Sequence, residues 1–248
     1  RFSALNMLPA ADTDVRPRLD RPRIAPPEAM ARMRDGRTAR LPAGWIQDGG
    51  LRAFRGDAGY LGRSIAALKL YLTLVVSQDA GPHADGQASI PAPIPMSYER
   101  IAALSGLSDP LICAGKRALI DQGLVATADE RPGGTIVYRL TGLRPSVAVV
   151  DLLHAPQECG RIDALHRLTC RKAPNLAALK TYLLLCADGG DPDGVVSLDI
   201  DAASRLTQIS HVKISAALLA LQGLGLAEPL ASPSRSGDHR RLRLLPLR

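Results

Sequence analysis

The sequence predicts a mainly α-helical chain in which one small unit, three helices followed by a β-hairpin, occurs twice. The first observation is an internal repeat at a constant spacing of 102 residues. The matched residues of the first copy are Leu104, Leu107, Ser108, Ile112, Leu119, Gly123 and Leu124, and those of the second copy are Leu206, Ile209, Ser210, Ile214, Leu221, Gly225 and Leu226. The second observation is that residues 66–71 resemble residues 177–182 at a spacing of 111, so one loop of the first copy is nine residues longer. A long repeat with a single insertion indicates a duplicated domain rather than a short-period solenoid.

The first two helices of the first copy follow from apolar density and from capping residues. Residues 65–76 carry too many apolar side chains for a surface helix, so they predict a buried helix. After a loop, Ser97 is placed to cap a second helix over residues 98–104. Gly106 is expected to end that helix.

The third helix of the first copy begins after a second capping residue. Ser108 precedes Asp109 and Pro110, and the first turn of a helix favours an acid and tolerates a proline. Gly123 is expected to end this helix in a left-handed conformation. Residues 125–128 and 135–140 are then predicted as two strands joined by a turn.

The second copy repeats this order with a more basic hairpin. Its predicted helices cover residues 176–187, 202–206 and 211–222. The closing segment, residues 239–245, alternates arginine with leucine as a strand with one buried face should. Residues 232–237 are the expected tip of the wing.

Helix, helix, turn, helix and hairpin is the order of a winged helix. Gly-Leu-Ser at residues 106–108, the branched Ile112 and the stretch 118–125 resemble the helix-turn-helix core of bacterial winged-helix DNA-binding proteins. In architecture alone, a pair of such units in a basic chain resembles the replication initiators of plasmids and mobile elements. The resemblance implies a fold class that is mainly α with small β-hairpin wings, namely two winged helix-turn-helix domains in tandem.

The predicted organisation is an arm, a domain, a linker and a second domain. These are an Arg/Pro-rich and partly disordered arm over residues 1–63, a winged-helix domain over 64–144, a linker helix region over 145–171 and a second winged-helix domain over 172–248. The net charge is +7, and the arm supplies most of it because it contains twelve arginines and seven acids. Up to about residue 27 the arm has the composition of an extended, mobile segment. A pI near 9.6 and such an arm favour a polyanionic partner.

The third helix of each unit is expected to enter the major groove of double-stranded DNA while the wing lies against the backbone. The candidate DNA-binding residues of the second copy are Thr207, Gln208, Ser210, His211 and Lys213 on the helix front and Arg235, His239, Arg240 and Arg241 in or beside the wing. Those of the first copy are Ser108, Lys116, Arg117 and Arg131, with Lys116 and Arg117 expected on the solvent face. Because the acidic Asp109 occupies the front of the first copy, the second domain should dominate DNA affinity. The first domain is then free to contact cytosine through Asp109, or a homodimer or protein partner.

No pattern in the sequence predicts catalysis or a cofactor. It has no GxSxG, no Walker loop, no HExxH and no GxGxxG that opens a helix after a strand. His154, Cys159, His166 and Cys170 are ligand types that zinc accepts, but their spacing matches no common zinc motif and a packed linker helix is the favoured interpretation. Residues 188–194 alternate carboxylates as a calcium loop does, yet they lack the terminal Glu and contain a proline, which favours a solvated turn.

The remaining expectations concern location and role. The sequence has neither an apolar run long enough to cross a membrane nor a signal-peptide layout, so a cytoplasmic protein without a membrane partner is expected. The favoured function is sequence-specific DNA binding in replication initiation of a plasmid or mobile element, or in transcription regulation. The alternative is a winged-helix scaffold for protein interactions in a nucleoprotein or chromosome-organising complex.

Overall fold

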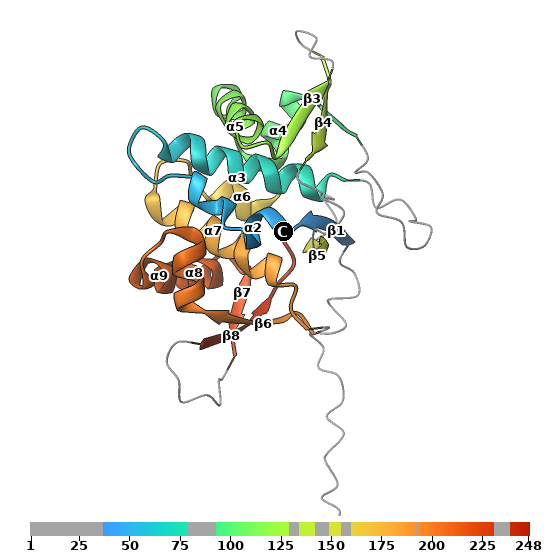
Figure 1. The fold of residues 1–248 in the computed structure, drawn as a ribbon. Helices are drawn as coiled ribbons and strands as arrows, with labels where there is room; N and C mark the ends of the chain where they lie inside the picture. Colours follow the sequence, from blue (N-terminus) through green and yellow to red (C-terminus); the bar gives the residue numbers. More distant parts are fainter. Residues whose placement is uncertain are drawn as a thin grey trace, which may run out of the picture.

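The computed structural model describes residues 37–78, 93–128, 134–141, 149–154, 160–191, 193–230 and 239–248. Over these residues the fold is mixed, with mainly helical structure and small antiparallel sheets. Two long helices, α3 (Leu61–Val76) and α7 (Ala173–Asp188), lie at the centre of Figure 1, with one group of elements above them and another below. The predicted mobile arm up to residue 27 lies outside the described residues.

The first unit is built from α3 and the elements that follow it. These are β2 (Ile94–Met96), α4 (Tyr98–Ser105), α5 (Asp109–Asp121), β3 (Val125–Ala128) and β4 (Ile136–Leu140). Ser97 caps α4 by accepting a hydrogen bond from the backbone of Arg100 at 3.2 Å, and Gly106 ends it with φ 68°, which confirms both predictions. The strands form an antiparallel sheet in the order β2-β4-β3, of which the sequence predicted β3 and β4 but not β2.

The second unit has the same order of elements. These are α7, β6 (Val195–Asp199), α8 (Ile200–Thr207), α9 (His211–Gly223), β7 (Ala227–Pro229) and β8 (His239–Leu244). The strands pair antiparallel in the order β6-β8-β7. Helix α8 begins two residues earlier than predicted because the Asp199 carboxylate accepts hydrogen bonds from the backbone of Asp201 and Ala202.

The core is built around α3 and α7. Thirteen of the sixteen residues of α3 and twelve of the sixteen of α7 are buried. Helix α3 packs against α5, α7 packs against α9, and α3 and α7 also contact each other. A helix that is apolar on all sides is stable only when other elements cover it, so the predicted burial of the first helix of the first copy is confirmed, and α7 is buried in the same way.

Two further segments precede the central helices. The segment before α3 contains β1 (Arg37–Pro42), α2 (Gly44–Gln47) and the 3-10 helix η1 (Gly50–Ala53), and the segment before α7 contains β5 (Val149–His154) and α6 (Asp163–Arg167). Strands β1 and β5 pair antiparallel, with Arg37 opposite His154 and Pro42 opposite Val149. The sequence assigned residues 37–53 to the arm and Leu152 to a linker helix. Residues 149–154 form a strand instead of a helix because their backbone groups pair with those of β1, which is more than a hundred residues away in the chain.

Each leading segment contacts a helix of the other unit. Nε of Arg52 in η1 donates a hydrogen bond to the carbonyl oxygen of Arg205 in α8 at 2.9 Å. Nε2 of His166 in α6 donates to the carbonyl oxygen of Ala103 in α4 at 2.8 Å. Ala103 and Arg205 are 102 residues apart and therefore occupy the same position of the repeat. The two units are thus related by an approximate two-fold arrangement within one chain, with β1 and β5 pairing across it.

Gly115 allows α5 to approach α3 closely. A Cβ added at Gly115 would lie 2.9 Å from the carbonyl carbon of Ala66 and 3.0 Å from the backbone nitrogen of Ala67. Both of these are backbone atoms of α3, so a side chain could be accommodated only by separating the two helices.

We therefore expect Gly115→Ala to lower the free energy of unfolding by about 1–3 kcal/mol, the usual cost of overpacking a core. The matched control is Gly223→Ala at the end of α9, where an added Cβ has no atom within 4 Å. Alanine should leave stability there unchanged or raise it slightly, because it has the higher helix propensity. Urea unfolding of both variants measures the difference, and equal stabilities would show that α3 and α5 are not in close contact.

Candidate nucleic-acid interface

The turn between α8 and α9 positions the front of the candidate recognition helix. Gln208 adopts a left-handed conformation with φ 55° at the end of α8, at the repeat position that Gly106 occupies in the first unit. Ile209 is buried, and Ser210 precedes α9 without making a capping hydrogen bond through its side chain. The turn is therefore anchored by Ile209, while the polar side chains on either side of it are exposed.

A buried lysine holds this turn from the central helix. Lys180 of α7 is 4% exposed, and its Nζ donates a hydrogen bond to the carbonyl oxygen of Thr207 at 2.8 Å. Burial lowers the pKa of Lys180 to about 8. Lys69 occupies the equivalent position of α3 and is also buried, but its Nζ donates to the carbonyl oxygen of Leu168 at 3.0 Å.

Four of the predicted DNA-contact residues lie exposed at the front of α9. These residues are Gln208, Ser210, His211 and Lys213. Nε2 of His211 lies 3.1 Å from Oδ1 of Asp201, and both side chains are more than half exposed. The Asp201 carboxylate therefore offsets positive charge beside His211. Lys213 is the basic residue of the helix front that lies outside this pair.

Thr207 does not belong to this surface. Its side chain is 1% exposed, and its hydroxyl donates a hydrogen bond to the carbonyl oxygen of Ala203 at 2.6 Å. The prediction that Thr207 is available to DNA is therefore wrong. The residue lies on the inner face of α8, where its hydroxyl is satisfied within the helix.

The basic strand of the second unit is exposed where it begins. His239, Arg240 and Arg241 of β8 are exposed, and Leu242 is buried against the core. The strand lies between β6 and β7, with His239 opposite Asp199 in β6. Arg235 lies outside the described residues.

The first unit presents less positive charge. Ser108, Asp109 and Arg117 are exposed, whereas Lys116 is only 7% exposed. The prediction that Lys116 lies on the solvent face is therefore wrong, because Nζ of Lys116 lies 5.5 Å from the ring centre of Tyr98. This cation–π geometry keeps the side chain against α4. Arg131 lies outside the described residues.

Sequence reasoning missed two exposed apolar residues on α9. Val212 is 80% exposed and Leu219 is 69% exposed. They follow each other at a spacing of seven residues, which places them on one side of a helix. The signal was present in the sequence, since α9 carries apolar residues on all of its sides.

The proposed zinc and calcium ligands do not form a site in the part of the chain that the structure describes. No group of three or more His, Cys, Asp or Glu side chains is placed to hold a metal ion among these residues. Nε2 of His166 is engaged with Ala103, and Cys159 lies outside the described residues. Oδ1 of Asp191 accepts hydrogen bonds from the backbone of Asp193 and Val195, as in a solvated turn.

Comparison with known proteins provides no relative. No family model, no curated protein and no solved structure matches the chain. Among the described residues, none of the helices has both the length and the apolar character that crossing a membrane requires.

The pKa of Lys180 predicts how its substitution changes stability with pH. Because the folded-state pKa is lowered, the folded protein releases a proton between about pH 8 and pH 10.5 that the unfolded chain retains. The contribution of Lys180 to the free energy of unfolding therefore rises with pH across this window, by about 3 kcal/mol at most.

We expect the difference in unfolding free energy between the wild type and Lys180→Met to grow in favour of the wild type across this window. Urea unfolding of both proteins from pH 7 to pH 10 measures it. The buried Cys186, whose pKa burial raises to about 12, titrates in both proteins, so its effect cancels in the difference. If the unfolding free energies of the two proteins change with pH in parallel, burial does not lower the pKa of Lys180.

Proposed function

We propose that the chain is a sequence-specific double-stranded DNA-binding protein in which each unit is a winged helix. The common order of helices and strands in the two units supports this proposal. In each unit the third helix follows a short turn, and the last two strands form a hairpin. In a helix-turn-helix the second helix of the pair lies in the major groove, so α5 and α9 are the proposed recognition helices.

The observation that carries the proposal is the polar and basic front of α9. Ser210, His211 and Lys213 stand at the start of a helix whose N-terminal residues would contact base edges. Arg240 and Arg241, exposed on β8, are suited to neutralise phosphates. Val212 adds an apolar side chain beside Lys213, and apolar contact with the methyl group of thymine is one means of reading the major groove.

The first unit is proposed to contribute less to affinity. Asp109 and Pro110 occupy the front of α5, and a carboxylate there repels phosphate. Its role is then either to read a base by accepting a hydrogen bond from cytosine or to contact a protein partner, including a second copy of the chain.

The cellular role follows from the same surface. We propose a cytoplasmic protein that acts in replication initiation of a plasmid or mobile element, or in transcription regulation. Both roles use one DNA-binding surface, and the sequence of the selected site distinguishes them. Sites that occur as repeats at a replication origin favour initiation, whereas sites within promoters favour regulation.

We expect substitutions on the second unit to weaken DNA binding in two different ways. Lys213→Ala, which removes a side chain from the helix front, should cost about 1–3 kcal/mol and relax specificity at one position. Arg240→Ala removes a phosphate contact, so it should weaken all sequences alike and reduce the salt slope by about one unit. The matched control is Arg117→Ala on α5, which should have the smaller effect on affinity.

The measurement begins with selection of duplexes from a randomised pool by the full chain. Titrations of the selected duplex over a range of salt concentrations follow for the wild type and the three variants. If Arg117→Ala abolishes binding while Lys213→Ala and Arg240→Ala do not change it, the first unit is the reader and the assignment is reversed. If no duplex binds even in low salt, the chain does not bind DNA.

The alternative function is a scaffold for protein interactions. The observation that favours it is the exposed apolar pair Val212 and Leu219 on α9, because a DNA-reading helix is more polar along its exposed side. A scaffold predicts that Leu219→Ser abolishes a protein complex and that the polar front is dispensable. DNA binding predicts that Leu219→Ser leaves duplex affinity unchanged, because Leu219 lies in the half of α9 farther from the bases.

A further inference from the structure

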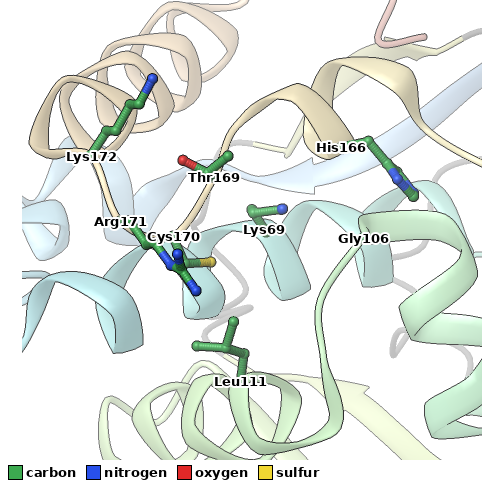
Figure 2. A pocket seen from close by; sticks show the side chains of 8 residues that line it. All are labelled: Lys69, Gly106, Leu111, His166, Thr169, Cys170, Arg171 and Lys172. Atoms are coloured by element: carbon green, nitrogen blue, oxygen red, sulfur yellow. The ribbon is translucent and has the colours of Figure 1, made fainter.

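A cavity of about 600 Å³ opens between α3, the turn that precedes α5 and the segment that leads from α6 into α7. Gly106 and Leu111 line it from the helix-turn-helix of the first unit, and His166, Cys170 and Arg171 line it from the opposite segment. In Figure 2, Lys69 lies between His166 on one side and Cys170 and Arg171 on the other.

Three of the side chains that line this cavity, those of Lys69, His166 and Arg171, carry basic groups. Figure 2 shows Arg171 directed toward Leu111 and His166 directed toward Gly106, while Lys172 stands at the rim with its side chain turned away from Leu111. No carboxylate is among the described residues that line the cavity. The acid nearest in sequence to a lining residue is Asp109, which is exposed at the start of α5.

Lys69 is the most constrained of these basic groups. It is 2% exposed, and its Nζ donates a hydrogen bond to the carbonyl oxygen of Leu168 at 3.0 Å. Within the described chain no carboxylate lies within ion-pair distance of it, and burial lowers its pKa. A buried ammonium group is costly unless an opposite charge accompanies it. An anion in the cavity would supply that charge and would accept the hydrogen bonds that the remaining N–H groups can donate.

The second unit provides an internal comparison. Lys180 occupies the same repeat position as Lys69 and also donates to a backbone carbonyl, but it lines neither this cavity nor a smaller one between α7, α8 and β6. A buried lysine at this repeat position therefore does not by itself account for the cavity beside Lys69. Thr169, Cys170, Arg171 and Lys172, from the segment that leads into α7, line one side of it.

We propose that this cavity binds a small phosphorylated molecule, with the phosphate group between Lys69 and Arg171. Guanidinium groups bind phosphate oxygens in a bidentate manner, and an ammonium group adds a point charge. The imidazole of His166 lines the cavity on the other side of Lys69. A cavity of this volume accommodates more than the phosphate itself, and Leu111 and the Cys170 side chain offer apolar contact to the remainder. The ligand would join the helix-turn-helix of the first unit to the segment that leads into the second.

The test is a calorimetric titration of the full chain with inorganic phosphate, at constant ionic strength maintained with chloride. The wild type should bind phosphate, and Arg171→Gln should weaken binding about tenfold or more, as expected for loss of a charge-assisted hydrogen bond. Lys69→Met should abolish it. The matched controls are Lys180→Met, at the equivalent buried position, and Arg139→Gln, which removes an exposed arginine of β4; both should bind as the wild type does.

Because Lys69→Met removes a buried charge, its fold is checked by circular dichroism, and Arg171→Gln alone decides the result if it does not fold. Absence of heat with wild type up to tens of millimolar phosphate overturns the proposal. Equal weakening by Arg171→Gln and Arg139→Gln overturns it as well, since it indicates diffuse attraction by net charge. If inorganic phosphate does not bind but Arg171→Gln lowers duplex affinity, the residue contacts the DNA backbone and the site for a small molecule is rejected.

Discussion

The packing of α3 against α7 is the constraint on which the rest of the structure depends. Both helices are buried over most of their length, so neither has a side suited to water, and each must be covered by its own unit and by the other. Helix α5 provides part of this cover, because Gly115 lets α5 contact the backbone of α3 without an intervening side chain. The two units consequently share one continuous hydrophobic core.

Polar contacts then set how the turns are held against this core. Arg52 and His166 reach from the leading segment of one unit to equivalent carbonyl groups, at Arg205 and Ala103, in the other. Lys180 holds the turn before α9 from within its own unit, whereas Lys69 donates to the segment that crosses the first unit. The two copies are therefore similar in backbone arrangement but different in what lies beside their turns, and duplicated units can acquire different roles in this way.

Charge follows the same division. In the second unit the cations at the front of α9 and at the start of β8 are exposed. In the first unit Lys116 is turned inward against Tyr98, and the basic residues beside α5 come from the segment that leads into α7. The proposed DNA contacts and the proposed phosphate site therefore lie in different parts of one basic chain.

The sequence by itself determined the three main helices of each unit and both ends of α4, because capping acts over a few residues: Ser97 and Gly106 bound α4 as their residue types predict. It also determined the repeat and the exposure of the polar front of α9. Only the tertiary structure decided that residues 149–154 form a strand, that Lys116 and Thr207 are buried, and that a cavity opens beside Lys69. Each of these depends on a partner distant in the chain or on which side of a helix is covered. The local sequence pattern carries no information about such contacts, since the same polar residue type occurs both buried against a partner and exposed to water.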